Sequence, residues 1–222
     1  MKVLSLGGSL IVPESIDTEY LIQFKEFVLR HVDQGEKFVI ICGGGKVCRN
    51  YYAALNIITK APSVEYDRLG VKSTELNAEL VRILFGDAAH PVVQPDYTKK
   101  TPFESILIGC GLKPGTSTDY DAIQYAITCG ADAVLNLSNI SFVYDKDPTH
   151  HKDAKPYERL TWSEFRSMFS AEWKAGTNVP FDPIASELAH RHGIKVMILH
   201  GRDLENVEKA LQGLPFKGTL IS

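Results

Sequence analysis

The sequence lacks long apolar runs, a marked excess of one charge and paired cysteine motifs. No apolar stretch in its 222 residues approaches the roughly 18 residues that a membrane-spanning helix requires. The 24 Lys and Arg residues stand against 27 Asp and Glu residues, and the net charge of −3 argues against a broad basic surface for nucleic acid. We therefore expect neither nucleic acid nor a membrane among the partners of this chain.

Cysteine and leader-like patterns are equally sparse. Of the four cysteines, at positions 42, 48, 110 and 129, no two have CxxC spacing, which favours reduced, mostly buried thiols over a zinc site or disulfides. The apolar stretch at residues 1–12 is interrupted by Gly7-Gly8 and followed by acidic residues. This pattern does not fit a secretory signal peptide, so we expect a cytoplasmic protein.

Apolar residues make up 44% of the chain, and their spacing alternates between two periods. Short apolar runs predict buried strands at residues 3–6, 38–42, 91–93, 105–108, 133–137, 194–199 and 218–221. Helical spacing predicts helices at residues 17–32, 46–58, 73–85, 119–128, 183–192 and 203–211, with Asp182 as the N-cap of the fifth. Strands separated by such helices imply right-handed crossovers, and therefore one domain, 1–222, with a mainly parallel sheet covered on both faces.

The remaining stretches have less regular patterns. Residues 94–102 and 144–159 show neither period, and the second stretch is either a solvated loop or a cover over a ligand. Trp162 and Trp173, with Phe165 nearby, predict a packed core in preference to a cofactor site.

Two predicted strands end in glycine-rich turns that lead towards a helix, Gly7-Gly8-Ser9 and Gly43-Gly44-Gly45-Lys46. At the carboxyl end of a parallel strand, such a turn lets backbone N–H groups approach an anion, and the helix N-terminus adds positive partial charge. Two turns on successive strands suggest two anions that meet, which phosphoryl transfer requires. Neither turn has the Walker A or GxGxxG pattern, so P-loop and dinucleotide-binding folds have no support.

Lys46 and Arg49 are three residues apart at the start of the predicted helix that follows the second turn. Cations in a first turn oppose the helix dipole, so a bound anion would explain their placement. Arginine suits a bidentate grip on phosphate. We predict that Arg49 binds the anion, and Lys46 either does so too or lies on a solvated helix face.

A third glycine-containing segment, residues 109–119, follows a strand and enters a helix. It carries the hydroxyls of Thr116, Ser117 and Thr118 and the carboxylate of Asp119. Hydroxyl and backbone groups can read a base edge, and the carboxylate can orient a lysine, a metal or water. The segment also has the composition of a helix cap, with Thr118 as the N-cap.

These motifs together resemble the amino-acid-kinase superfamily, and within it the uridylate (UMP) kinases of the archaeal-like type. The resemblance follows the family's order over nearly the whole chain. Its pieces are Leu6-Gly7-Gly8-Ser9, Gly43-Gly44-Gly45-Lys46 with Arg49 and Tyr51, Asp67-Arg68-Leu69-Gly70, Ser73-Thr74, Asn77-Ala78, Gly115-Thr116-Ser117-Thr118-Asp119, Val143-Tyr144, Asp147-Pro148, Phe181-Asp182-Pro183 and Gly218-Thr219.

The resemblance implies a three-layer αβα sandwich and the reaction ATP + UMP → ADP + UDP, a step of pyrimidine nucleotide biosynthesis. It places UMP on the N-terminal part, residues 1–130 or so, and ATP with Mg²⁺ on the remainder, 131–222. It also implies a homo-oligomer, either a dimer or a hexamer. No set of protein metal ligands is predicted.

The resemblance also implies roles for single residues. On the acceptor side, the phosphate, ribose and uridine contacts of UMP fall on Gly43, Gly44, Arg49, Asp67, Thr116 and Thr118. On the donor side, the ATP contacts fall on Gly7, Gly8, Ser9, Tyr144 and Asp147. The catalytic group that organises charge around the transferred phosphoryl comprises Gly8, Ser9, Lys46 and Asp119.

The chain departs from the family pattern at two places. Ser5-Leu6 stands where many members carry a lysine before the first glycine pair, and Lys46 is one candidate to replace it. Ser141-Phe142 stands where the family usually has Asp-Gly before Val-Tyr, which affects the donor side.

Other activities remain open on the same scaffold. One is another small-molecule kinase, of the acetylglutamate or isopentenyl phosphate type. The latter would call for a histidine beside the second glycine turn, where this chain has Cys42 and Lys46. The other is a non-catalytic protein that binds a nucleotide or an oxoanion.

Overall fold

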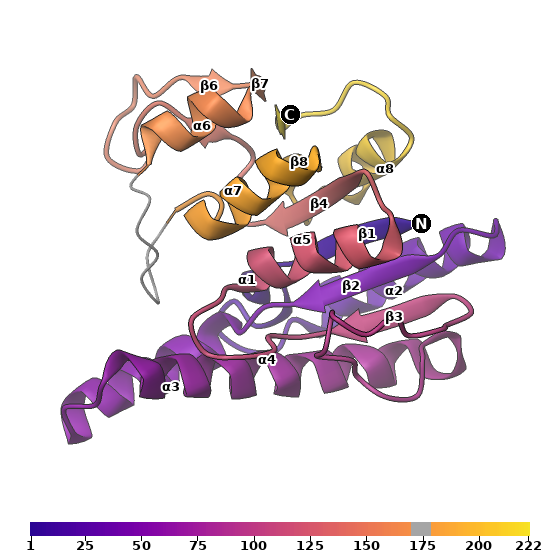
Figure 1. Ribbon diagram of the computed structural model, residues 1–222, viewed down its shortest axis with the longest axis horizontal. Helices are drawn as coiled ribbons and strands as arrows, with labels where there is room; N and C mark the ends of the chain where they lie inside the picture. Colours follow the sequence, from indigo (N-terminus) through magenta and orange to yellow (C-terminus); the bar gives the residue numbers. More distant parts are fainter. Residues whose placement is uncertain (170–178) are drawn as a thin grey trace.

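Helices and strands alternate along the chain and build a seven-stranded sheet in the order β3-β2-β1-β4-β8-β9-β7, beside a small sheet of β5 and β6 (Figure 1). The computed structural model describes residues 1–169 and 179–222. The strands are β1 (Lys2–Leu6), β2 (Phe38–Cys42), β3 (Ile106–Gly109), β4 (Ala133–Ser138), β5 (Val143–Tyr144), β6 (Pro156–Tyr157), β7 (Arg159–Leu160), β8 (Lys195–His200) and β9 (Thr219–Ile221). The helices are α1 (Gly8–Ile11), α2 (Thr18–Asp33), α3 (Gly45–Ile58), α4 (Ser63–Phe85), the 3₁₀ turn η1 (Gly86–Ala88), α5 (Thr118–Cys129), α6 (Trp162–Met168), α7 (Pro183–His192) and α8 (Leu204–Leu211).

Five neighbouring strands, β3, β2, β1, β4 and β8, run parallel. Their carboxyl ends therefore lie at one edge of the sheet, where ligands bind in open α/β folds. The central strand β1 pairs with β2 on one side and with β4 on the other, with Leu6 opposite both Cys42 and Leu137. At the far side of the sheet β9 runs antiparallel to β8.

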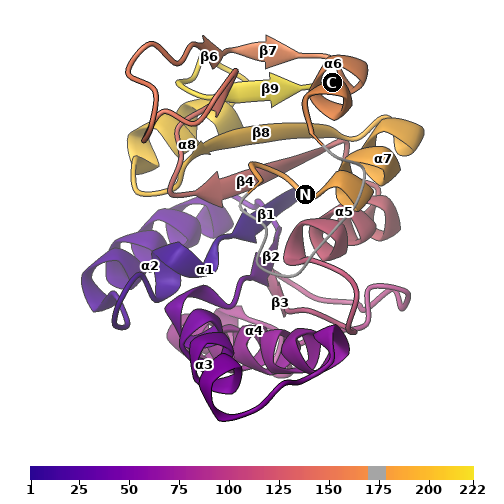
Figure 2. The same ribbon diagram turned by 90° about the vertical axis from the view of Figure 1, so that its left-hand side faces the viewer.

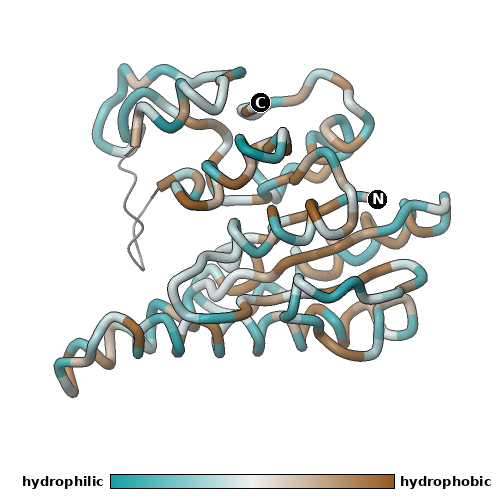
Figure 3. The backbone as a smooth tube through the Cα atoms, viewed as in Figure 1, coloured by the Kyte–Doolittle hydropathy of each residue, from teal (hydrophilic) through white to brown (hydrophobic). Residues whose placement is uncertain are grey.

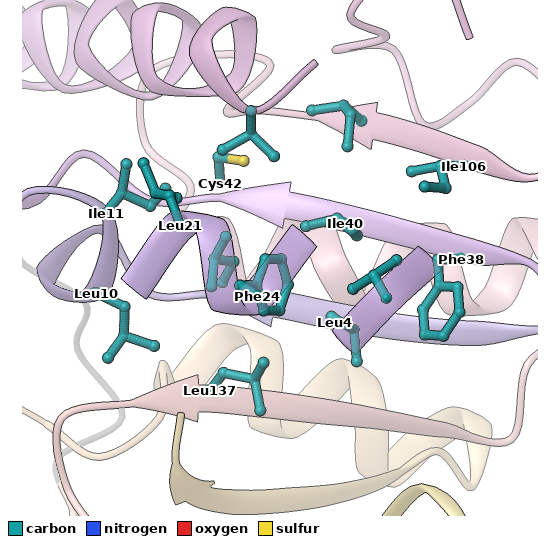
Figure 4. Close-up of a cluster of buried hydrophobic side chains, with 14 of the residues drawn as sticks. Leu4, Leu10, Ile11, Leu21, Phe24, Phe38, Ile40, Cys42, Ile106 and Leu137 are labelled. Atoms are coloured by element: carbon teal, nitrogen blue, oxygen red, sulfur yellow. The ribbon is translucent and has the colours of Figure 1, made fainter. Parts of the chain in front are cut away.

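Helices cover both faces of the sheet, which confirms the predicted three-layer αβα sandwich (Figure 2). One face packs against α2, α4 and α8, and its core contains Leu4, Phe24 and Phe38, all fully buried (Figure 4). The opposite face packs against α5, α6 and α7. The two faces follow from alternation along the strands, since Leu4 belongs to the first core and Val3 to the second. In Figure 3, β2 runs through the molecule as a largely hydrophobic tube.

Most predicted elements appear within a few residues of their expected ends, and Asp182 caps α7 by accepting a hydrogen bond from the Ala185 N–H. One predicted strand and one predicted helix cap differ from the structure. Residues 91–93 form a bend and not a strand, because only the flanking His90 and Gln94 N–H groups bond to β3, at Ile106 and Ile108. The N-cap of α5 is Ser117 instead of Thr118, since the Ser117 side chain accepts from the Tyr120 N–H.

Helix α4 starts at Ser63, ten residues before the predicted start at Ser73. Its first turns lie against α3 and not on the sheet, so they lack the apolar period of a core helix. Gly70 in this part lets α3 approach closely, since a Cβ there would come within 2.6 Å of the Tyr52 hydroxyl on α3. The predicted pattern therefore covered only the part of α4 that packs on the core.

Other expectations about side chains can be compared directly. Trp162 and Phe165 are buried in the second core, as predicted, whereas Trp173 lies outside the described residues. All four cysteines are free thiols, and two of them, Cys42 and Cys110, are buried. No helix within residues 1–169 or 179–222 combines the length and the apolar character that a bilayer crossing demands.

A buried histidine ties α2 to α8 and to the segment before β2. His31 Nε2 lies 2.9 Å from a Glu208 carboxylate oxygen, and Nδ1 lies 3.0 Å from a Glu36 oxygen. Replacing His31 with leucine leaves both carboxylates without this partner, and we expect a loss of about 1–3 kcal/mol of unfolding free energy. Urea unfolding measures the loss. Equal stability of His31→Leu and of the exposed control His150→Leu would contradict this role.

Candidate active site

The carboxyl edge of the sheet brings the two predicted glycine turns together. The first turn leaves β1 between β2 and β4, and the Gly7 N–H donates to the Leu137 carbonyl at 2.9 Å. The second leaves β2, and the Gly43 N–H donates to the Leu6 carbonyl at 3.0 Å. Each turn is thus bonded to the end of a neighbouring strand, so the sheet sets the position of both.

The two turns touch through their backbones. A Cβ on Gly8 would lie 2.0 Å from the Gly45 nitrogen and 2.6 Å from the Gly43 carbonyl carbon, so no larger residue fits there. Gly45 also has φ of +60°, a conformation that favours glycine. In the first turns of α1 and α3, the Leu10 N–H donates to the Gly7 carbonyl at 2.8 Å and the Lys46 N–H donates to the Val12 carbonyl at 2.9 Å. The remaining first-turn N–H groups have no acceptors within their own helices, so they are the backbone donors of this contact region.

Two polar side chains of α4 make hydrogen bonds to the backbone of the second glycine turn and of the third predicted segment. The Asn77 amide donates to the Gly43 carbonyl at 2.7 Å and to the Gly44 carbonyl at 3.1 Å, and its side chain is buried. The Thr74 hydroxyl accepts from the Gly111 N–H at 3.0 Å. Neither residue was among the predicted site residues. Their signal in the sequence is a polar side chain on the core-facing side of a helix.

The two cations of α3 face the segment that follows α1. Lys46 Nζ lies 2.7 Å from a Glu14 carboxylate oxygen, and the Arg49 guanidinium donates to the Pro13 carbonyl at 3.3 Å. Arg49 is exposed and keeps further N–H donors, because one hydrogen bond uses only one of five. An acidic partner for Lys46 within the chain was not predicted, and it offsets the unfavourable position of this cation at a helix start.

Asp67 lies beside the third predicted segment. Its Oδ2 accepts from the Gly115 N–H at 2.9 Å, next to Thr116, whose hydroxyl donates to the Lys113 carbonyl. Burial raises the pKa of Asp67, and the Gly115 N–H partly offsets this rise. Within the described part of the chain, Oδ1 of Asp67 is buried with no hydrogen-bond partner. This carboxylate can therefore accept from a ligand hydroxyl, as predicted for the ribose.

Asp119 stands at the start of α5 among polar groups from three elements. Its Oδ1 accepts from the Asn136 amide at 2.8 Å and from the Ser5 hydroxyl at 3.4 Å, and Oδ2 accepts from the Asp182 N–H at 3.2 Å. Burial, with the nearby Asp182 carboxylate, raises the pKa of Asp119 to about 7. Ser5 therefore occupies the place beside Asp119 where a lysine would give charge compensation.

The raised pKa of Asp119 shows that its negative charge is poorly compensated in the folded protein. A bound cation would stabilise the ionised carboxylate. No group of three or more potential metal ligands is assembled within residues 1–169 and 179–222. Mg²⁺ typically needs only one or two carboxylates, because phosphate oxygens and water complete its shell. The oxygen donors at Asp119 fit such an ion when phosphates are bound.

Asp121, two residues after Asp119 in α5, is fully buried, and neither carboxylate oxygen has a hydrogen-bond partner of ordinary geometry in the described part of the chain. Burial raises its pKa to about 8, and the nearby Leu112 backbone N–H offsets only part of this rise. Asp121 was not among the predicted site residues. An acid with a folded-state pKa above its unfolded value, near 3.9, destabilises the fold increasingly as pH rises between those values.

We expect Asp121→Asn to stabilise the protein, and to do so more at pH 8 than at pH 5. The amide has the same shape but no charge to bury. Thermal unfolding at the two pH values measures the difference, with the exposed Asp153→Asn as the control. An Asp121→Asn variant with no gain at pH 8 would show that the carboxylate has a compensating partner.

The predicted donor residues Tyr144 and Asp147 lie further along the same edge. Tyr144 is half-buried in β5, with its ring centroid 6.2 Å from that of Phe142. Asp147 accepts from the Thr149 N–H at 2.8 Å, and these bonds within its own loop lower its pKa. The structure does not join Asp147 directly to the glycine turns. The stretch 144–159 contains β5, β6 and β7 and is not simply a loop.

A cavity of about 660 Å³ lies at the opposite edge of the sheet. It is lined by the first residues of β1 and β8, including Lys2 and Lys195, and by the loop after α8, including Phe216. None of the predicted site residues lines it. The cavity therefore does not compete with the carboxyl edge as the place of the chemistry.

Comparison with known proteins gives a consistent picture. The chain matches the model of the amino acid kinase family over residues 1–103 and 67–200. The uridylate kinase of Methanobrevibacter smithii is 31% identical over 215 residues, which cover 95% of this chain and 94% of that protein. The uridylate kinase of Methanothermobacter thermautotrophicus is 32% identical over 215 residues, with 95% of both proteins covered.

Solved structures agree with these relatives. The crystal structure of the uridylate kinase from Archaeoglobus fulgidus superposes with a TM-score of 0.84 at 30% identity, and all of both chains is covered. The UMP kinase from Bacillus anthracis has a TM-score of 0.78 at 23% identity, covering 99% of this chain and 94% of that one. The second match is a likeness of fold.

Proposed function

The chain belongs to the amino acid kinase family, and we propose that it is a uridylate kinase, which transfers the γ-phosphoryl group of ATP to UMP and releases ADP and UDP. The observation that supports this proposal is the backbone contact between the two glycine turns, because two loops of a type suited to phosphate lie side by side. Full-length relatives named uridylate kinases favour UMP over acetylglutamate or isopentenyl phosphate as the acceptor. The product UDP would supply pyrimidine nucleotide biosynthesis.

On the acceptor side, UMP binds between α3, α4 and the segment before α5. The UMP phosphate lies against Gly43 and Gly44. The Arg49 side chain changes its rotamer, gives up its hydrogen bond to the Pro13 carbonyl and donates to this phosphate instead. The ribose hydroxyls donate to Asp67, whose Oδ1 is available. Thr116 and Thr118, which follow Gly115, contact the uridine. The support for this arrangement is the 2.9 Å hydrogen bond between Asp67 and the Gly115 N–H.

On the donor side, the transferred phosphoryl group lies at Gly7, Gly8 and Ser9, and the adenosine lies towards Tyr144 and Asp147. The N-terminal part, residues 1–130 or so, thus carries the acceptor and the rest, 131–222, the donor. The central position of β1 supports this division, since β2 and β4 flank it from the two parts of the chain.

The protein aligns the reactants and offsets charge, with little covalent chemistry of its own. Asp119 would hold Mg²⁺, which neutralises charge on the phosphate oxygens when it is bound. Backbone N–H groups of the two turns would donate to the equatorial oxygens, and this fixes the phosphoryl group so that the attacking and leaving oxygens lie in line with phosphorus. The Lys46 ammonium would leave its ion pair with Glu14 and contact the transferred phosphoryl group. Lys46 would then supply the positive charge that many family members take from a lysine at the position of Ser5-Leu6. No general base is needed, because the phosphate monoester of UMP is already anionic near neutral pH.

Steady-state kinetics tests the proposed function directly. ADP release is measured with ATP and Mg²⁺ against UMP, dUMP, CMP, AMP and GMP, and UDP is identified as the product. Turnover confined to UMP supports the proposal. A folded protein that binds UMP and turns over none of the five acceptors would contradict it and favour a non-catalytic nucleotide-binding protein.

We propose that the enzyme works in the cytoplasm as a homo-oligomer assembled through α3. Figure 1 shows this helix extending beyond the sandwich alongside α4. No side chain of α3 is buried in the described part of the chain. Its two last residues, Ile57 and Ile58, are apolar and yet expose 86% and 76% of their surface. Exposed apolar side chains on a neighbouring pair of residues mark an interface better than a solvated face.

Replacing both Ile57 and Ile58 with glutamate should convert the assembled protein to a monomer. Two buried charges at the interface would oppose association. Light scattering after gel filtration measures the mass, and Ile22→Glu on α2, at a residue that is 54% exposed, is the control. A monomeric wild-type protein, or a double variant with unchanged mass, would remove α3 from the interface.

A further inference from the structure

Phe142 and Tyr144 form an aromatic pair that the established elements of the fold do not require. Their ring centroids are 6.2 Å apart with an interplanar angle of 79°, and both side chains are half-buried. They flank Val143, which is fully buried in the second core and donates its N–H to Thr219 at 2.8 Å. Tyr144 faces away from the side of β5 that Val143 buries, because side chains alternate along a strand. The Phe142 ring, which directly precedes β5, lies against the Tyr144 ring.

The segment that carries this pair starts at the phosphoryl turn. A Cβ on Gly7 would lie 2.7 Å from the Leu137 carbonyl oxygen and 3.6 Å from the Ser138 Cα, so the end of β4 rests against the first glycine turn. Phe142 is four residues after Ser138, and four residue steps span at most roughly 14 Å. That span is comparable with the length of an extended nucleoside triphosphate.

The segment is anchored on both sides of Phe142. The Ile140 N–H donates to the Ser138 hydroxyl at 3.3 Å, and the Ile140 side chain packs against the second core, as Val143 does. The Phe142 ring lies beside the Tyr144 ring, and among the described residues neither belongs to the two core clusters. The nearly perpendicular rings leave the face of one ring and the edge of the other for a planar partner.

We propose that Phe142, with Tyr144, is the stacking platform for the base of the donor nucleoside triphosphate, and that it accepts purine and pyrimidine bases alike. This inference rests on the proposed function, because that function places the donor beside the first glycine turn. Stacking is tolerant of base identity, since every base has a π-face. Ser141 adds no carboxylate beside the platform that would select one set of exocyclic groups.

Calorimetric binding of ATP, GTP and CTP, each with Mg²⁺ and without UMP, tests the platform. We expect the three dissociation constants of the wild-type protein to agree within about tenfold. Phe142→Ala should weaken binding of all three by roughly tenfold, about 1.4 kcal/mol, whereas Phe142→Tyr should keep wild-type affinity. Phe103→Ala is the matched control, because Phe103 is also half-buried but lies near Lys37, before β2, at the opposite edge.

Two results would overturn the inference. One is wild-type affinity for ATP in a folded Phe142→Ala variant, and the other is a preference of more than roughly 100-fold for ATP over both GTP and CTP. UMP-dependent ADP release in the same preparations separates this inference from the proposed function. Phe142-dependent triphosphate binding without UMP turnover would support the platform and contradict the kinase, and the converse result would contradict only the platform.

Discussion

Replacing Asp119 with asparagine is expected to lower kcat by roughly 100- to 1000-fold, with little change in the KM for UMP. Asparagine keeps the shape of the side chain and the oxygen that the Asn136 amide contacts, but it removes the charge that would hold Mg²⁺ at the phosphates. The residue acts where charge shifts during transfer and not where UMP is gripped, so the effect should fall on kcat.

Stability distinguishes this role from a structural one. Because burial raises the pKa of Asp119 to about 7, the ionised carboxylate costs the folded state free energy at pH 8, and the asparagine variant should melt no lower than the wild type there. Kinetics and thermal unfolding at pH 8 are the two measurements. A variant that loses activity and stability together would show that Asp119 mainly supports the fold. Unchanged kcat would remove it from the chemistry.

Replacing Arg49 with alanine is expected to raise the KM for UMP by roughly 10- to 150-fold, because a charge-assisted hydrogen bond to phosphate is lost. The exposed side chain holds only the Pro13 carbonyl in this structure, so its removal should leave the fold intact. Saturating UMP should restore most of the wild-type rate. Initial rates over a range of UMP concentrations at fixed ATP measure both parameters.

Two further variants sharpen this test. Arg49→Lys keeps a point charge without the bidentate geometry, so its KM should fall between those of the wild type and the alanine variant. Arg30→Ala removes an exposed arginine in the last turn of α2, at the other edge of the sheet, and should leave UMP kinetics unchanged. Normal UMP kinetics in Arg49→Ala would show that another group holds the acceptor phosphate.

The sequence predicted well those elements that have the same burial pattern along their whole length. Strand β2 is buried throughout, and α2 buries one stripe from Tyr20 to His31, so both patterns are unambiguous. The first ten residues of α4 pack on α3 and carry no such period. The short strands β5, β6 and β7 contain two residues each, too few to show an alternation.

The candidate site was predictable where glycine marks a turn and much less so where a side chain supports one. The two glycine turns meet as expected, because the carboxyl ends of neighbouring parallel strands share an edge. The contacts of Asn77 with the Gly43 turn and of Asn136 with Asp119 depend on tertiary packing. A polar residue within an apolar pattern, as Asn136 is within β4, was the available signal for this support.

The backbone contact of Gly8 with Gly43 and Gly45 limits which properties of this enzyme evolution or redesign can alter. The spacing of the two turns is set by strand register and main-chain van der Waals radii, so it does not vary with side-chain rotamers. Under the proposed function, much of the entropic cost of bringing two phosphates together is met once, when the chain folds, and not at every turnover. A different acceptor can thus be selected by altering α3, α4 and the segment before α5, while a longer transfer distance would demand a new sheet.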